Sequence, residues 1–111
     1  MTDYYAKQGD VNETLRMRLK NIVDLSAVDR VETRVWLPLQ PATVLEAEVV
    51  DEDECIVDVL LGDETGWLCT EALPLEYRME TEAFFLDGSS KTVPNADPPD
   101  RLIVSARGRT E

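Results

Sequence analysis

The feature that most constrains the fold is a strict alternation of side-chain types in successive short stretches. Val31, Thr33, Val35 and Leu37 alternate with Glu32, Arg34 and Trp36. At 43–50 the apolar Leu45, Ala47 and Val49 alternate with Val44, Glu46 and Glu48, and at 55–61 Cys55, Val57, Val59 and Leu61 alternate with Ile56, Asp58 and Leu60. Successive side chains of a β-strand point to opposite faces of a sheet, so a period of two predicts strands. Proline interrupts sheets, and Pro38 and Pro41 end the first stretch. The sequence therefore predicts three strands over these ranges.

Turn-forming segments separate these stretches and organise the rest of the chain. Four like charges at Asp51–Glu54 and the sequence GDETG at 62–66 are typical of turns. A further strand is expected to begin at Trp67 and stop before Pro74, so that residues 43–72 form a three-stranded antiparallel meander. After a short helical or irregular piece around 71–76, the pattern predicts a strand over 78–87, a loop over 88–100 and a last strand over 101–107.

The N-terminal third has a different pattern. Residues 1–9 are polar and are expected to form a flexible arm. Asp10 is suited to cap a helix, and Glu13 stands three residues later, as in a capping box. The apolar residues that follow are spaced as on one face of a helix, which predicts an amphipathic helix over 11–27. Its basic side chains either face solvent or form a ridge that contacts a ligand; they are Arg16, Arg18 and Lys20.

The length of 111 residues suits one domain with one hydrophobic core. We therefore expect a mainly β (α+β) fold in residues 10–111, with five or six antiparallel strands preceded by the helix. No apolar run approaches the roughly 20 residues that cross a bilayer. The segment MTDYYAKQGD also lacks the apolar centre of a signal peptide. These observations predict a soluble, cytoplasmic protein.

The net charge of −12 is concentrated in the middle of the chain. Residues 31–75 carry eleven acidic side chains and one basic side chain, Arg34, so their net charge is −10. Such a segment either attracts a partner with a basic surface or reflects adaptation to molar salt. The three lysines beside abundant Asp and Glu resemble the composition of proteins from salt-loving archaea. In a halophilic cell, acidity would not exclude a nucleic-acid ligand.

The residue types also argue against catalysis. The chain has no histidine, which removes the usual general base near neutral pH. Cys55 and Cys69 are too few for a typical zinc site and are expected to be buried free thiols. The GDETG turn lacks the lysine and the helix of a phosphate-binding loop, and neither acidic turn has EF-hand spacing. We expect a protein that is not an enzyme and needs no cofactor or metal.

The stretch VLEAEVVDEDECIVDVLLGDETGWLCTEAL resembles the first three strands of the single-stranded-DNA-binding OB-folds of replication protein A and its archaeal relatives. Asp63, Thr65 and Gly66 match the Asp-x-Thr-Gly turn of that family. The resemblance implies a small antiparallel OB-like barrel whose fourth and fifth strands are 78–87 and 101–107. It also implies that the 88–100 loop covers the ligand.

The resemblance further implies a set of nucleic-acid contacts. Alternation after the turn would direct Trp67 outward as a platform for base stacking, whereas the competing interpretation places it at the barrel end or in an interface. Trp36 is outward by alternation and is expected to be covered by the helix. Phe84 and Phe85 point to opposite faces, so only one is in the core, and the other lines the groove or lies under the 88–100 loop. Phe84 is counted among the nucleic-acid contacts. The candidate phosphate contacts are Arg34, Arg78, Lys91, Arg101 and Arg107.

Two functions follow as hypotheses. The first is a binding module for single-stranded DNA or RNA, or a component of a replication or repair assembly. The second is an acidic protein–protein adaptor, or a small viral or accessory protein, that binds a basic partner. A third hypothesis, self-association through apolar strands and the helix face, rests on the exposed apolar pattern alone.

Overall fold

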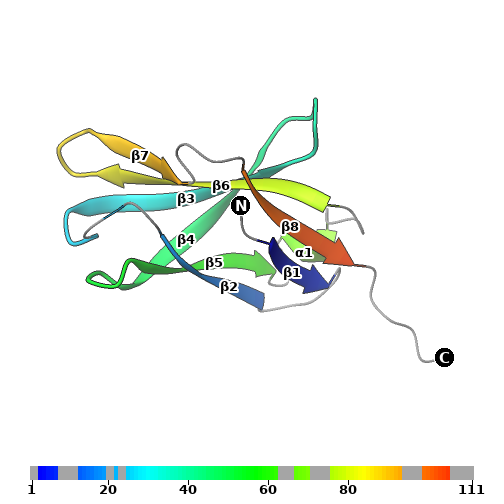
Figure 1. The fold of residues 1–111 in the computed structure, drawn as a ribbon, viewed down its shortest axis with the longest axis horizontal. Helices are drawn as coiled ribbons and strands as arrows, with labels where there is room; N and C mark the ends of the chain where they lie inside the picture. Colours follow the sequence, from blue (N-terminus) through cyan, green and yellow to red (C-terminus); the bar gives the residue numbers. More distant parts are fainter. Residues whose placement is uncertain are drawn as a thin grey trace.

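A computed structural model describes residues 3–7, 13–19, 22, 25–62, 67–70, 76–93 and 99–105. These residues form one sheet that curls into a nearly closed, barrel-like shape (Figure 1). The sheet has eight strands rather than the expected five or six. The strands are β1 (Asp3–Lys7), β2 (Glu13–Arg18), β3 (Val28–Trp36), β4 (Thr43–Asp51), β5 (Ile56–Gly62), β6 (Glu76–Phe85), β7 (Ser90–Val93) and β8 (Asp100–Ser105), and the short helix α1 is Trp67–Thr70.

The strands follow the order β1-β8-β6-β3-β4-β5-β2, and β7 also pairs with β6. One side of β6 pairs with β3 along most of its length, whereas its other side pairs first with β8 and then with β7. Every pair is antiparallel except β1 with β8, which is parallel. The prediction of a purely antiparallel barrel is therefore wrong at this one pair.

The core forms because each strand buries every second side chain. On β3 the buried side chains are Val31, Thr33 and Val35. Met79 on β6 and Leu102 on β8 belong to the same core and are fully buried. The two buried hydroxyls of Thr33 and Thr81 bond to each other over 2.9 Å. This pairing satisfies polar groups that would otherwise destabilise an apolar interior. The predicted strands at 31–37, 43–50, 55–61 and 78–87 are confirmed within a few residues at their ends. The strand predicted at 101–107 is confirmed over 101–105, and residues 106–107 lie outside the described part of the chain.

The predicted helix at 11–27 is wrong. Residues 13–18 form β2, which pairs with β5, and residues 28–36 already belong to β3. Leu15 and Met17 turn toward the core, while Arg16 and Arg18 point outward. The same apolar residues fit both periods. A helix would satisfy its own backbone hydrogen bonds, but pairing with β5 satisfies them as well and packs Leu15 and Met17 against the core. Tertiary pairing therefore overrides the weaker local helix preference.

The prediction of a flexible arm at 1–9 is wrong for residues 3–7. Residues 3–7 form β1 and pair with β8 from Asp3 opposite Arg101 to Lys7 opposite Ser105. Tyr4 and Ala6 pack against the core, whereas Tyr5 is exposed. Residues 1–2 and 8–10 lie outside the described part of the chain. The strand forms because its backbone pairs with β8 while alternate side chains, Tyr4 and Ala6, pack against the core.

Two further predictions change in the second half. The expected strand at 67–72 begins instead as the helix α1, with Trp67 and Leu68 both buried. Adjacent side chains of a strand point to opposite faces, so burying both Trp67 and Leu68 in one core suits a helical turn better than a strand with one face toward solvent. The loop predicted at 88–100 contains β7, which pairs with the last part of β6. The turn at 63–66 and residues 94–98 lie outside the described residues.

Cys55 is buried, as predicted, and it forms no disulfide with any residue that the structure describes. It lies in the left-handed region with φ of 57°, and its thiol donates a hydrogen bond to the carbonyl of Ile22 over 3.1 Å. The side chain of Cys69 lies outside the described set. Across the described residues, no helix is long and apolar enough to span a membrane.

The hairpin between β3 and β4 projects from the body of the molecule (Figure 1). At its end Leu39 is fully exposed and has φ of 63°. A left-handed conformation costs an L-residue about 1–2 kcal/mol, and an exposed leucine regains none of that through packing.

Replacing Leu39 with glycine should therefore leave the free energy of unfolding unchanged or raise it by up to about 1 kcal/mol. The relief of backbone strain is partly offset by the extra freedom that glycine has in the unfolded chain. Urea denaturation measures the difference, with Leu39→Val as the matched comparison. The β-branched valine should lower stability, and a valine variant as stable as the glycine variant would contradict the strained turn.

Candidate functional site

The predicted outward orientation of Trp67 is wrong. Its side chain is only 6 % exposed and belongs to the core cluster. The ring packs edge-on against Tyr77, with centroids 4.9 Å apart and planes at 81°. This is a favourable aromatic geometry in a protein interior. Trp67 is therefore a core residue, which neither interpretation predicted, and it offers no platform to a base.

Four of the other predicted contacts share the outer surface of three neighbouring strands. Arg78 on β6 stands opposite Trp36 on β3 and opposite Arg101 on β8. Arg34 lies two residues before Trp36, and Phe84 lies near the other end of β6. Lys91 stands opposite the buried Ala83, which places it on the other side of the β6–β7 pair from Phe84. Arg107 lies outside the described residues.

The aromatic residues of this surface are only partly as predicted. Phe85 packs against the core and Phe84 faces outward, so the expected division between the two is confirmed. The guanidinium of Arg30 lies 4.0 Å from the centre of the Phe84 ring. Trp36 is half-buried, but the helix that was expected to cover it is absent, since residues 13–18 are strand.

Most arginines of this surface already hold carboxylates. Arg34 pairs with Glu82 over 2.8 Å. Arg101 bonds both oxygens of Asp3, at 2.8 and 2.7 Å, and reaches Glu76 over 3.0 Å. The hydrogen bond from Arg101 lowers the pKa of Asp3, and the bonds to Asp3 and then Glu76 raise the pKa of Arg101. A phosphate would have to compete with these carboxylates.

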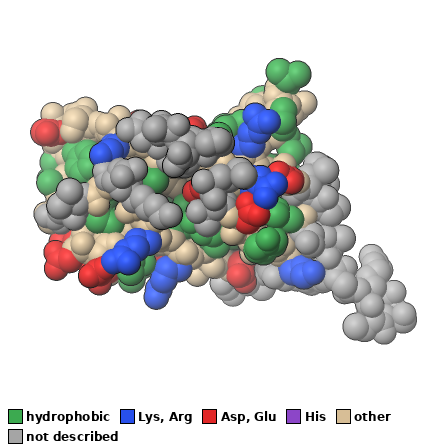
Figure 2. Space-filling view, in the orientation of Figure 1, with side chains coloured by type: hydrophobic (Ala, Val, Ile, Leu, Met, Phe, Trp, Pro, Cys, Tyr) green, Lys and Arg blue, Asp and Glu red, His purple; other side chains and the backbone are tan. Residues whose placement is uncertain are grey.

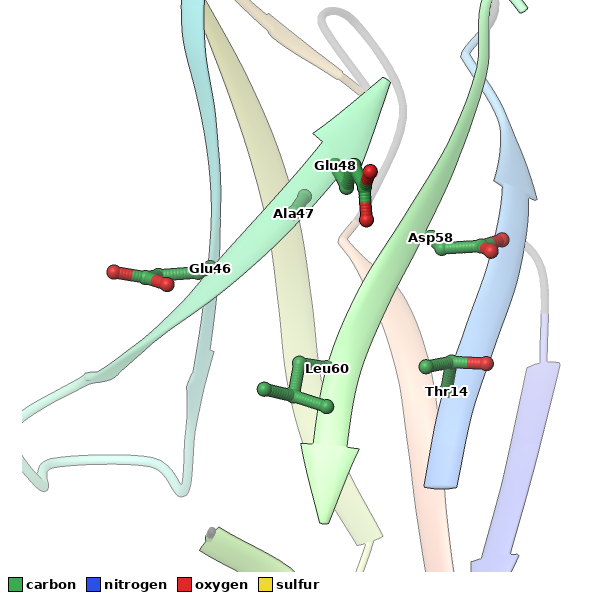
Figure 3. A pocket seen from close by; sticks show the side chains of 6 residues that line it. All are labelled: Thr14, Glu46, Ala47, Glu48, Asp58 and Leu60. Atoms are coloured by element: carbon green, nitrogen blue, oxygen red, sulfur yellow. The ribbon is translucent and has the colours of Figure 1, made fainter. Parts of the chain in front are cut away.

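A second surface has the opposite character. The outward side chains of β4, β5 and β2 surround a hollow of about 220 Å³, and we call this surface the acidic face (Figure 3). The hollow lies where β4 and β5 part, because they pair only between Ala47–Asp51 and Ile56–Val59. Figure 3 shows Leu60 in the gap between the two strands. The lining residues are Thr14, Glu46, Ala47, Glu48, Asp58 and Leu60.

Like charges stand opposite each other across the strands of the acidic face. Glu48 pairs in register with Asp58, and Glu32 stands between Glu46 and Glu82. Carboxylates directly opposite each other destabilise a sheet, so folding alone does not favour this arrangement. Asp58 is compensated by Arg16, whose Nε and Nη2 bond its two oxygens at 2.9 and 3.1 Å.

Glu46 and Glu48 differ from Asp58 because they form no ion pair with any residue that the structure describes. Both are exposed. Exposed apolar side chains flank them on the same face, with Val44 at 54 % and Leu60 at 39 % exposure. The acidic face therefore combines uncompensated negative charge with apolar surface around a shallow hollow.

The ion pair between Arg16 and Asp58 should make the stability of the protein depend on pH. The hydrogen bond from Arg16 lowers the pKa of Asp58 below its unfolded value. A lowered pKa contributes stability above the unfolded pKa, and that stability is lost as the pH falls through the folded pKa. The difference in free energy of unfolding between the wild type and Asp58→Asn should be largest at neutral pH and shrink below about pH 4.

Urea titrations of both proteins at several pH values measure this difference. Glu48, the nearest carboxylate across β4 and β5, remains in both proteins and cancels in the comparison. A difference that grows as the pH falls would contradict the assignment of the ion pair.

Sequence patterns found part of the acidic face and missed the rest. Alternation placed Glu46, Glu48 and Asp58 outward on their strands, and the structure agrees. Thr14 and Arg16 were missed because their segment was assigned to a helix. No group of three or more acidic or cysteine side chains among the described residues is arranged to hold a metal ion. The sequence matches no protein-family model and no curated protein.

Proposed function

We propose that this chain is a non-catalytic binding module whose acidic face binds a basic partner protein. The observation that carries the proposal is the pair of exposed carboxylates, Glu46 and Glu48, which form no ion pair with any described residue and are flanked by Val44 and Leu60. Charge of one sign attracts and orients a partner of the other sign. The apolar side chains then provide area that is removed from water on binding.

An OB-type barrel remains part of the proposal, and it favours the same face. The chain order β3, β4, β5, α1, β6 and β8 suits such a barrel if β3, rather than the segment at 43–50, is its first strand. β4 and β5 are then its second and third strands, because the segment expected as the third strand begins as α1. In OB-folds the face of those two strands binds the ligand. In this chain that face carries Glu46, Glu48 and Asp58, which would repel phosphate and attract cationic side chains.

Single-stranded nucleic acid is the second candidate, and one observation favours it. Trp36 and Arg78 stand opposite each other on the outer surface, and Arg30 stacks on Phe84 farther along the same strands. Exposed aromatic rings with arginines suit stacking of unpaired bases. It ranks second because Arg34 and Arg101 are engaged by carboxylates. A high-salt cytoplasm would screen the repulsion between the phosphates of the nucleic acid and the acidic side chains of the rest of the protein.

Fluorescence anisotropy distinguishes the two candidates. The probes are a labelled peptide that alternates arginine and leucine, and a labelled single-stranded oligonucleotide, each titrated from dilute buffer to molar KCl. We expect the peptide to bind more tightly than the oligonucleotide at low salt and to weaken as salt rises. Glu46→Gln combined with Glu48→Gln should weaken peptide binding about tenfold, or roughly 1.4 kcal/mol.

The matched control removes two negative charges from another part of the surface. Glu52→Gln with Asp53→Asn changes exposed carboxylates in the turn between β4 and β5, away from the hollow. This control should retain most of the affinity for the peptide. Equal losses in the two double variants would mean that only total charge matters, and oligonucleotide binding that survives molar KCl would favour the second candidate.

A further inference from the structure

The beginning of β4 has a free edge. One side of β4 pairs with β3 from Thr43 to Ala47, whereas its other side pairs with β5 only from Ala47 onward. Residues 43–46 therefore have no strand beside them on that second side, in the part of the chain that the structure describes. The hairpin that leads into this part of β4 stands clear of the body of the molecule (Figures 1 and 2).

This edge leaves backbone groups that can pair with a further strand. In an antiparallel sheet, the N–H and C=O groups of successive residues point alternately to the strands on either side. Two of the residues in 43–46 therefore direct these groups away from β3, toward the free side. No turn hydrogen bond between described backbone groups involves 43–46. An extended peptide that adds to a sheet edge forms main-chain hydrogen bonds with groups of this kind.

The hollow of the acidic face lies directly beside this edge. Glu46 and Ala47 line it from β4, and Leu60 lines it from β5. The last residue of β5 that pairs with β4 is Val59, and β5 continues to Gly62, so the two strands part here around the hollow of about 220 Å³. Figure 3 shows Leu60 in this gap. The free edge of β4 therefore has open space next to it.

Charge indicates which kind of strand suits the edge. Glu46 faces outward at the edge itself, and it forms no ion pair with any described residue. On the β3 side it stands opposite Glu32, another carboxylate. A second copy of β4 would bring further glutamates to this place, and charged side chains protect exposed edges against such pairing. A strand with basic side chains would instead place opposite charges across the pair, which stabilises a sheet.

We propose that an extended, basic segment of the partner protein adds to the sheet as a strand along residues 43–46 of β4. This inference rests on the proposed function, because it states how the basic partner is held at the acidic face. Basic side chains of the segment lie on the outer face, opposite Glu46, and the apolar side chains between them lie on the inner face, beside Leu45. The main-chain hydrogen bonds provide affinity, and the alternate side chains provide specificity.

The outer edge of β2 is a poorer site for the same segment. β2 is the last strand in the sheet order, so its second side also lacks a strand among the described residues. Its outward side chains include Arg16 and Arg18. Like charges directly opposite each other destabilise a strand pair. A basic segment is therefore favoured at β4 and not at β2.

Peptides with methylated backbone nitrogens test the proposal with the full chain. In a strand, the N–H groups of alternate residues point to opposite edges. In the alternating arginine–leucine peptide, methylating every leucine nitrogen blocks one edge, and methylating every arginine nitrogen blocks the other. Fluorescence anisotropy should show that one methylated peptide binds about tenfold more weakly than the unmodified peptide, because its hydrogen bonds to β4 are lost, and that the other binds like the unmodified peptide.

A peptide of the same composition serves as the control for sequence pattern. Its arginines occupy one half and its leucines the other, so a strand formed by it cannot place all basic side chains on one face. It should bind more weakly than the alternating peptide although its charge is identical. Equal affinities of these two peptides would overturn the proposal.

Amide hydrogen exchange followed by NMR locates the added strand. Saturation with the unmodified peptide should slow exchange at least about tenfold at two alternate residues within 43–46, because their N–H groups become hydrogen-bonded. The proposal is overturned, and the proposed function stands, if both methylated peptides bind like the unmodified one, exchange at 43–46 is unchanged, and Glu46→Gln with Glu48→Gln still weakens binding. An unmodified peptide that does not bind at all would overturn both.

Discussion

Replacing Trp67 with alanine should lower the free energy of unfolding by about 3–5 kcal/mol, the usual range for removing a buried aromatic side chain. Trp67 is almost fully buried and packs against Tyr77 in an edge-on geometry. The substitution removes both the apolar area and the aromatic contact and leaves a cavity that the sheet cannot close. Guanidinium denaturation followed by circular dichroism measures the change.

Trp36→Ala is the matched control for this prediction. Trp36 is the other tryptophan of the chain and lies half-buried on the outer surface of β3. Its removal should cost clearly less stability, because part of its surface already contacts water. A Trp67→Ala protein as stable as the wild type, or one destabilised less than Trp36→Ala, would contradict the burial of Trp67.

Replacing Thr81 with valine should destabilise the protein by about 1–3 kcal/mol, because it leaves the buried hydroxyl of Thr33 without its partner. The two hydroxyl oxygens are 2.9 Å apart, and Thr81 also donates to the sulfur of Met17 over 3.9 Å. Thr33→Val should cost less, since the Thr81 hydroxyl keeps the contact with Met17. Urea denaturation of both variants measures this asymmetry.

The double variant Thr33→Val with Thr81→Val completes a thermodynamic cycle. Valine has nearly the shape of threonine, and removing both hydroxyls leaves no buried polar group unpaired. The double variant should therefore be more stable than Thr81→Val alone. Additive losses from the two single substitutions would show that the hydroxyls do not act as a pair.

The strands that alternate clearly were predictable, whereas the segments with two compatible patterns were not. Val31–Val35 on β3 fits only a period of two, and its strand was found within a few residues. Leu15 and Leu19 are four apart, as on a helix face, but Leu15, Met17 and Leu19 are also two apart, as on a strand. The choice between these patterns depends on the edge of β5, which would be unpaired without β2. Sequence alone does not reveal that this edge is available.

The residues of the candidate site were also predictable only in part. Glu46, Glu48 and Asp58 were placed outward because each stands between apolar neighbours that must face the core. The bond from Arg16 to Asp58 depends on register between segments 42 residues apart in the chain. The opposition of Glu48 and Asp58 depends on the register of β4 with β5. Trp67 was misplaced because a turn motif suggested a strand after it, where the chain instead buries Trp67 and Leu68 together in α1.

The binding face is tested most directly by the backbone amide NMR spectrum recorded during titration with the alternating arginine–leucine peptide. Residues whose signals move on addition of peptide mark the contact surface. We predict that the shifts concentrate at Thr14, Glu46–Glu48 and Asp58–Leu60, the residues around the hollow between β4 and β5. Shifts that instead gather at Trp36, Arg78 and Phe84, or that spread evenly over all exposed carboxylates, would contradict a binding site on the acidic face.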